Sequence, residues 1–384
     1  MKKILYILGC IMLLITITTY SVLDNKKTYA DQTIDLTCKS AFLIDYDSDT
    51  IIFEKEKDKK LPIASMVKLM TIYLTFDSVE QGILKYDQKI ISSELASSMG
   101  GSQVFIDPFC EYSVEDLLKS VIISSANDAS VVLAEAISGS VESFVEKMNT
   151  TANDLGMKNT LYCNPTGLPA PQQYSTAYDC AILMKNILKF EDYHKYSTIW
   201  LDSLIHPSGR KTELVNTNKL IRYYDGCDSG KTGSTNEAGY CLTSSAKRGN
   251  MRLISVIIGC KTGKDRFKEA TTLLNYGFAN YTNKQLLCTD NVVKEMETTK
   301  CKSKNALIVP KENYYAFDKK GKTSNYEINY ELPEKISPCK AGAVVGKAII
   351  TKDGNVVKVV DLTVKETLEA ISFKDSFKNI IKAW

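Results

Sequence analysis

Histidine is nearly absent from this chain of 384 residues, which contains only His194 and His206. Neither histidine lies in a recognisable constellation with a serine and an aspartate, so a Ser-His-Asp triad is poorly supported. The eleven cysteines are scattered and include no Cys-x-x-Cys pair. Because imidazole and paired thiolate ligands are both lacking, we expect no zinc site and no other metal or cofactor.

An excess of charge of one sign is also absent. Without residues 1–30, which contain four lysines and one aspartate, the chain has 44 basic and 44 acidic residues. Such a balance gives no indication of nucleic acid binding. Arginine is scarce as well, at five of the 48 basic residues. An arginine in this chain can therefore mark a place where a planar guanidinium is needed to bind a carboxylate.

Long apolar runs are absent after the first, which extends from Ile4 to about Leu23. Two lysines precede this run, and the small residues Thr28 and Ala30 follow it. This pattern predicts a secretory signal peptide over residues 1–30 and export of the mature chain. An uncleaved membrane anchor is the alternative, because the run is long enough to span a bilayer.

The first part of the mature chain mixes strand and helix patterns. Ala41–Asp45 and Ile51–Glu54 flank a polar turn and predict a β-hairpin. A helix beginning near Ser65 is apolar almost all round, so we expect it to be buried. Ser113 is expected to cap a further helix, and Arg252–Gly259 is typical of a strand buried on both faces.

Helical periodicity disappears after about Asn283, where strand-like runs take over. Asp353-Gly-Asn355 predicts a hairpin turn between the last two runs. We therefore predict a mixed domain over residues 31–284 and a small β domain over residues 285–365.

The last segment, residues 366–384, is predicted to be an amphipathic helix that lies in a membrane interface. Lysines lie beside its apolar face, and packing of the helix on the β domain is the less favoured alternative. The apolar face consists of Phe373, Phe377, Ile380, Ile381 and Trp384.

Ser65-Met-Val-Lys68 supplies a nucleophile with an amine base. At the start of a helix, the backbone N–H of Ser65 points toward developing negative charge. Lys68 lies three residues later, on the same helix face. Burial in an apolar helix should lower its pKa and leave a free amine to act as base. A lysine that reaches solvent is the alternative.

Ser125-Ala-Asn127 follows a helix and supplies a polar relay. The hydroxyl of Ser125 is suited to pass a proton to a leaving amine, and the amide of Asn127 to bind a substrate amide. Lys231-Thr-Gly233 leads into a strand that we expect at a sheet edge. Lys231 supplies positive potential, Thr232 a hydroxyl, and Gly233 room for a substrate backbone. The backbone N–H of Ser234 is then a second donor for an oxyanion.

Each motif alone is weak, because copies occur elsewhere in the chain. The copies of Ser-x-x-Lys, Ser-x-Asn and Lys-Thr-Gly begin at Ser208, Ser244, Ser337, Ser234, Ser303 and Lys261. The Ser-x-x-Lys copies fall in predicted loops or strands, and the copies at Ser234 and Ser303 lack an upstream partner in the required order. The Lys261 copy follows a predicted buried strand and is better interpreted as a turn. The order of Ser65, Ser125 and Lys231 along the chain therefore identifies the functional set.

The three motifs resemble those of the D-alanyl-D-alanine carboxypeptidases, the low-molecular-mass penicillin-binding proteins. The similarity covers nearly the whole mature chain, and the stretch at Gly100 is similar to sporulation-type members. Further matching stretches are Leu61–Thr71, Gly100–Phe105, Asn164–Leu168, Asn216–Leu220, Asp228–Gly233 and Ala238–Tyr240.

The resemblance implies an α/β (α+β) fold of the penicillin-binding transpeptidase and β-lactamase type, with an antiparallel sheet packed by helices. It also implies removal of the terminal D-alanine from peptidoglycan pentapeptide stems, at the outer face of the cytoplasmic membrane or in the cell-wall space. Penicillins would acylate the same serine. By position, the resemblance makes Ser65 the nucleophile, Lys68 its base, Ser125 and Asn127 assisting groups, Lys231 and Thr232 substrate contacts, and Arg266 the residue that binds the terminal carboxylate.

Two departures from the family pattern stand out. Ala126 replaces the usual glycine, and Ser234 replaces the histidine often found after Lys-Thr-Gly; neither change removes a reacting group. A β-lactamase is disfavoured because no Glu-x-x-Leu-Asn motif lies between Ser125 and Lys231. A DD-endopeptidase stays open, and an inactive wall-binding protein is disfavoured by the intact motifs.

Overall fold

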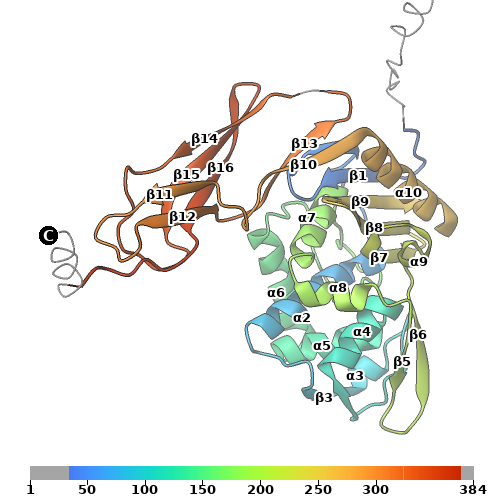
Figure 1. Cartoon of the computed structure of the whole chain (residues 1–384). Coiled ribbons are helices and arrows are strands. Elements are labelled where there is room, and N and C mark those ends of the chain that lie inside the picture. The colour runs from blue at the N-terminus through green and yellow to red at the C-terminus, as the bar shows by residue number, and fades with distance from the viewer. Residues whose placement is uncertain (1–33, 323, 373–384) are drawn as a thin grey trace, which may run out of the picture. The chain divides into compact units, whose positions relative to one another are not determined.

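The computed structural model describes residues 34–322 and 324–372 (Figure 1). A five-stranded antiparallel sheet with strand order β2-β1-β9-β8-β7 forms the base of the mixed region. The predicted hairpin and the predicted doubly buried strand are both confirmed, as β1–β2 and β9. The strands are β1 (Ser40–Asp45), β2 (Ile51–Lys55), β7 (Cys227–Thr235), β8 (Gly239–Arg248) and β9 (Met251–Cys260).

Both faces of this sheet are covered by helices, which explains the apolar sequence of β9. Helix α10 (Gly263–Asn280) packs on the face that carries Leu253, since a side chain at Gly277 would run into that leucine. Alternate residues such as Ile254 face the opposite way and join the core of the helical region. Helix α7 (Ala177–Ile187) contacts β9 as well.

The helical region surrounds α2 (Lys68–Glu80), which contacts α4, α5, α6 and α7 and is buried on nearly every side, as predicted. Ser113 caps α4 by accepting a hydrogen bond from the backbone N–H of Asp116, as predicted. The remaining elements are η1 (Ala64–Val67), α3 (Glu94–Ser97), α4 (Val114–Ser124), α5 (Asn127–Ser138), α6 (Val141–Asp154), α8 (Glu191–Ser197), α9 (Leu220–Tyr223), the hairpin β3 (Lys89–Ile91)–β4 (Glu111–Ser113) and the hairpin β5 (Leu201–Ile205)–β6 (Lys211–Val215).

The C-terminal region is all β, with one five-stranded sheet of order β11-β12-β16-β15-β14 and the pair β10–β13. The predicted hairpin turn is confirmed: Asp353 and Gly354 both have positive φ, as a two-residue turn of this kind requires. The strands are β10 (Tyr281–Leu287), β11 (Lys294–Glu297), β12 (Asn305–Pro310), β13 (Tyr314–Lys319), β14 (Tyr326–Glu331), β15 (Val344–Lys352) and β16 (Asn355–Val364).

Residues 366–372 correct the prediction of a helix over 366–384. They are irregular, because Leu368 is buried in the core of the β sheet and forms a bridge with Cys339. The apolar stripe from Phe373 to Trp384 and the predicted signal peptide lie outside the described residues. Over residues 34–322 and 324–372, no helix combines the length and apolar character needed to cross a bilayer.

Candidate active site

Ser65 lies in the 3₁₀ turn η1, and the α-helix begins only at Lys68. The sequence placed Ser65 at the start of the helix itself. The structure corrects this because Ala64, directly before the serine, has a φ of +49°. A residue with a side chain is rarely found in this conformation, and such strain collects at functional sites. The turn leaves Ser65 half-buried while its neighbours Met66 and Val67 enter the core.

Lys68 is the fully buried partner of this serine. Its Nζ lies 3.1 Å from the Oγ of Ser65 and donates to the carbonyl oxygen of Thr166 at 2.5 Å. Burial lowers the pKa of the Lys68 amine well below its usual value, and the positive charge of Lys231 lowers it further, against an opposing effect of Asp128. The alternative of a lysine that reaches solvent is therefore wrong. A free amine that donates one N–H to Thr166 keeps its lone pair for the proton of Ser65.

The segment Asn164–Leu168 holds this arrangement in place, and sequence reasoning gave it no role. The Oδ1 of Asn164 accepts hydrogen bonds from the backbone N–H groups of Thr166 at 3.1 Å and Gly167 at 2.7 Å. Gly167 has a φ of +78°, and a Cβ there would lie 2.1 Å from the carbonyl oxygen of Ala64. Glycine is therefore required where this segment packs against the nucleophile turn. The Asn-Pro-Thr-Gly sequence was the available signal.

Ser125 and Asn127 lie at the junction of α4 and α5, which both pack on α2. Ser125 adopts the left-handed conformation (φ 62°, ψ 34°) that ends α4. Its Oγ is buried and has no hydrogen-bond partner within the described part of the chain. The Oδ1 of Asn127 is likewise buried and unpartnered there. Buried polar atoms are normally satisfied, so these two are candidates for contact with a substrate.

Lys231, Thr232 and Gly233 lie on β7, which is the edge strand of the sheet, as predicted. Burial and the repulsion of Arg266 lower the pKa of Lys231 to about 7. Thr232 Oγ1 donates to Thr217 Oγ1 at 2.8 Å. A Cβ at Gly233 would lie 3.0 Å from the Ser65 nitrogen, so the glycine lets β7 approach the nucleophile turn. This is a reason for glycine that the sequence did not reveal.

Ser234 lies near the C-terminal end of β7, and Arg266 on α10 approaches this end of the strand. Ser234 is exposed, and Arg266 reaches over from α10 to donate to the carbonyl oxygen of Gly233 at 3.1 Å. The Nε of Arg266 is buried and has no partner among residues 34–322 and 324–372. Arg266 also lines a cavity of about 880 Å³ together with Tyr240. The guanidinium thus retains donor capacity for an anionic group.

One of the five arginines, Arg252, confirms the expectation that an arginine in this chain can mark the binding of a carboxylate by a planar guanidinium. Arg252 on β9 binds Asp228 at the start of β7 through two hydrogen bonds, of 2.8 and 2.6 Å. This pair ties the strand of the Lys231 motif to the sheet. Burial alone would raise the pKa of the Asp228 carboxyl group, but hydrogen bonds from His194 and Arg252 lower it. The Ser-x-x-Lys copies at Ser208, Ser244 and Ser337 lie in a turn, a strand and a loop, as predicted.

The described residues contain no cluster of histidine, cysteine or acidic side chains that could hold a metal ion. Within the same residues, Cys241 and Cys260 are buried free thiols. The chemistry that the arrangement permits is therefore attack by a hydroxyl activated by an amine, beside groups that bind an amide and an anion.

Comparison with protein-family models matches residues 25–262 to "D-alanyl-D-alanine carboxypeptidase" and residues 281–370 to "Penicillin-binding protein 5, C-terminal domain". The chain is 38% identical to the D-alanyl-D-alanine carboxypeptidase DacF of Bacillus subtilis, over 100% of this chain and 99% of the relative. It is 33% identical to DacA of Haemophilus influenzae, over 91% and 90% of the two chains. Among solved structures, penicillin-binding protein 5 of Haemophilus influenzae superimposes with a TM-score of 0.70 and 32% identity, over 87% of this chain and 98% of that one.

Proposed function

The chain belongs to the D-alanyl-D-alanine carboxypeptidase family of penicillin-binding proteins, and from this membership we propose a role for each residue of the site. The protein is a serine-type D-alanyl-D-alanine carboxypeptidase that acts on peptidoglycan stem peptides. The single observation that supports the assignment of roles is the contact of 3.1 Å between Ser65 Oγ and the buried amine of Lys68.

Acylation begins when the Lys68 amine takes the proton of Ser65 Oγ, which then attacks the carbonyl carbon of the penultimate D-alanine. The backbone N–H groups of Ser65 and Ser234 stabilise the oxyanion of the tetrahedral intermediate. As the C–N bond breaks, Ser125 passes its hydroxyl proton to the leaving amine of the terminal D-alanine and takes up the proton that Lys68 received, which returns Lys68 to the free amine. Water then attacks the ester on Ser65 and restores the free enzyme.

The remaining residues bind the substrate. The free Oδ1 of Asn127 accepts the N–H of a stem-peptide amide. Lys231 and Thr232 supply positive potential and a hydroxyl near the carboxylate, and Gly233 keeps the strand close to the nucleophile. Arg266 binds the terminal carboxylate through its unpartnered Nε–H. β-Lactam antibiotics acylate Ser65 through the same contacts.

Fluorescent penicillin, applied to the wild type and to Ser65→Ala, tests this proposal. We expect stable labelling that is lost in the variant, and D-alanine release from a pentapeptide that is lost with it. Rapid release of the label would favour a β-lactamase, and absence of labelling in the wild type would favour a binding protein without activity. Cleavage of cross-linked stem peptides in preference to pentapeptides would instead favour an endopeptidase.

We further propose that the protein is exported and acts at the outer face of the cytoplasmic membrane, with a role in cell-wall maturation. The basic and apolar pattern of residues 1–30 supports export. The apolar stripe from Phe373 to Trp384 supports association with the membrane surface. Deletion of residues 373–384 should move the protein from the membrane fraction to the soluble fraction; unchanged fractionation would contradict the membrane proposal alone.

A further inference from the structure

Asn127, which the proposed function assigns to substrate amide binding, is held by the loop Gly100–Cys110. Its Nδ2 donates to the carbonyl oxygen of Gly100 at 2.6 Å, and its backbone N–H donates to that of Ser102 at 2.7 Å. One of the two Nδ2 hydrogens is therefore used, whereas Oδ1 has no partner among the described residues and is the acceptor available to a substrate. The direction of Oδ1 follows from the position of the loop, because the loop supplies both acceptors.

This loop forms no helix or strand, so other groups must satisfy its backbone. Asp128, the neighbour of Asn127, accepts hydrogen bonds from the N–H groups of Val104 at 3.0 Å and Ile106 at 3.1 Å. Phe105 between them has a φ of +61°, which is an outlier for a bulky residue. Such a conformation persists only where the surroundings fix it firmly.

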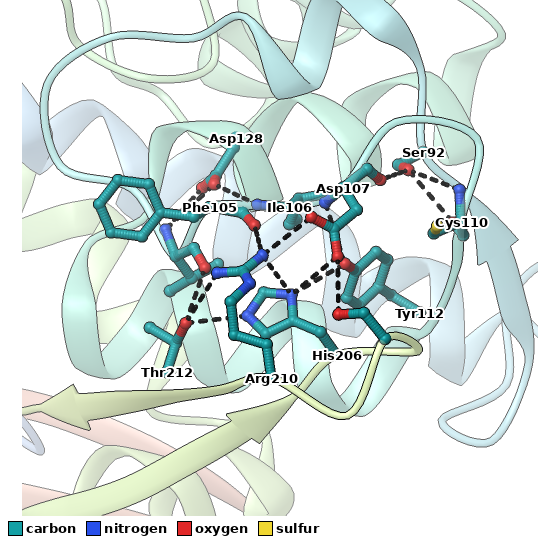
Figure 2. Close-up of polar contacts among 12 residues, drawn as sticks. Ser92, Phe105, Ile106, Asp107, Cys110, Tyr112, Asp128, His206, Arg210 and Thr212 are labelled. Atoms are coloured by element: carbon teal, nitrogen blue, oxygen red, sulfur yellow. Dashed lines mark hydrogen bonds and ion pairs between the residues drawn. The ribbon is translucent and has the colours of Figure 1, made fainter.

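The surroundings that fix the loop from its other side belong to the hairpin β5–β6 (Figure 2). Arg210, in the turn of the hairpin, donates to the carbonyl oxygen of Phe105 and to the carboxylate of Asp107 at 2.9 Å. Thr212 on β6 donates to the carbonyl oxygen of Val104 at 3.2 Å. The hairpin and the loop are far apart in the sequence, yet these contacts bind one to the other.

The hydrogen bonds around His206 determine which of its ring nitrogens carries the hydrogen. Thr212 Oγ1 gives its single hydrogen to the carbonyl oxygen of Val104, which can only accept, so the neighbouring Nε2 of His206 must be a donor. The hydrogen therefore sits on Nε2, which donates to Thr212 Oγ1 at 2.8 Å and leaves the threonine hydroxyl hydrogen for the loop. Nδ1, which lies 3.1 Å from Nη2 of Arg210, accepts the hydroxyl hydrogen of Tyr112 at 2.9 Å, and the tyrosine oxygen accepts the backbone N–H of Asp107 at 3.0 Å. The imidazole is buried and neutral, because burial and the charge of Arg210 lower its pKa.

We propose that Arg210 and His206 are positioning residues for the carboxypeptidase reaction: through the loop Gly100–Cys110 they hold the Asn127 amide in the direction that accepts the substrate N–H. Neither residue is proposed to touch the substrate. The inference rests on the proposed role of Asn127. It assigns to the hairpin β5–β6 a function in substrate recognition that the three sequence motifs do not contain.

The test replaces Arg210 by alanine, because 39% of this side chain is exposed and the truncation leaves the core intact. Arg248→Ala is the matched control: Arg248 is 35% exposed and pairs with Asp225, away from the loop. We expect Arg210→Ala to lower kcat/KM for D-alanine release from a pentapeptide about 10- to 100-fold, as the displacement of a binding group does. Acylation by a penicillin with an acylamino side chain should fall with it, and Arg248→Ala should retain wild-type rates.

A double-mutant cycle with Asn127→Ala separates positioning from general damage. If Arg210 acts through Asn127, then Arg210→Ala should have almost no further effect once Asn127 has been replaced. Equal fold-losses in both backgrounds would overturn the proposal. His206→Gln, which lacks the imidazole geometry, should show the same dependence on Asn127.

Hydrogen exchange of the loop gives a readout that does not need activity. The N–H groups of Val104, Ile106 and Asp107 are bonded in the wild type, and we expect their exchange to accelerate in Arg210→Ala but not in Arg248→Ala. Unchanged exchange would show that Arg210 does not hold the loop Gly100–Cys110 in place, whatever substrate the enzyme acts on. Faster exchange together with an inactive wild type would instead contradict the proposed function.

Discussion

At the scale of single residues, the two buried lysines of the site, Lys68 and Lys231, have different proposed roles. Lys68 is fully buried, and the lowering of its pKa by burial favours its proposed role as a base. Burial and Arg266 lower the pKa of Lys231 to about 7, so its positive charge is lost progressively as the pH rises through that value. Removal of the positive charge of Arg266 should let Lys231 keep its proton to a higher pH, because Arg266 is one cause of the shift.

We therefore expect the second-order rate constant for acylation by a penicillin to fall on the alkaline side with a midpoint near the Lys231 pKa of about 7. Arg266→Gln should move this midpoint upward, whatever it does to the maximal rate. Stopped-flow acylation between pH 5 and pH 10 measures both. A midpoint that stays in place in Arg266→Gln, as it should in the control Arg248→Gln, would contradict the assignment of the alkaline limb.

Buried His206 should make the stability of the fold depend on pH. The pKa of His206 is lowered from 6.5, so the unfolded chain binds this proton more tightly than the folded one. Stability from this residue is therefore complete above about pH 6.5 and is lost as the pH falls through the lower folded value. Urea unfolding at pH 7 and pH 5 should show a smaller loss in His206→Gln than in the wild type. An equal loss in His206→Gln and the wild type would contradict this assignment.

At the scale of elements, the contact between the segment Asn164–Leu168 and the turn η1 decides the geometry of the nucleophile. Gly167→Ala would place a Cβ 2.1 Å from the carbonyl oxygen of Ala64, in addition to the cost of a φ of +78°. Gly82→Ala has a similar φ of +72° but meets no atom within 4 Å. The control should therefore lose only about 1 kcal/mol of stability and keep its activity.

In Gly167→Ala, we expect acylation by fluorescent penicillin to fall about 100-fold or more, since the turn that carries Ser65 must move. Labelling kinetics and thermal unfolding of the two variants give the comparison. Equal acylation rates in both would show that the close approach does not position the nucleophile.

The contact between Asn164–Leu168 and η1 illustrates which features of the fold and the site can be predicted from the sequence and which cannot. The paired strands and the buried helix after Ser65 follow from apolar periodicity, and the reacting side chains follow from local motifs such as Ser65–Lys68. The carbonyl oxygens of Thr166 and Gly100, which fix Lys68 and Asn127, belong to the backbone, so a motif such as Asn-Pro-Thr-Gly marks the segment but not the hydrogen bond that it makes. Both carbonyl groups come from segments distant in the sequence from the residues that they contact, so only the structure shows these contacts. The irregular course of residues 366–372 was missed for a similar reason, because Leu368 is fixed by long-range packing.

At the scale of the whole molecule, the chain has separate cores that share no residue. The core around α2 takes its buried residues from Phe42 to Ile258, and the β core takes its own from Leu287 to Leu368. All nine predicted site residues lie between Ser65 and Arg266. Helix α10, which carries Arg266, ends at Asn280 before the first strand of the β region. Chemistry and C-terminal β structure thus use different parts of the sequence.

This separation predicts that a fragment of residues 34–280 folds on its own and is still acylated. We expect the fragment to unfold cooperatively and to take up fluorescent penicillin within about threefold of the full-length rate, because an independent core is the condition for an independent domain. Ser65→Ala in the fragment is the control and should abolish labelling. A fragment that shows native-like circular dichroism but no labelling would mean that residues beyond Asn280 complete the site. A fragment without cooperative unfolding would mean that α10 depends on the strands that follow it.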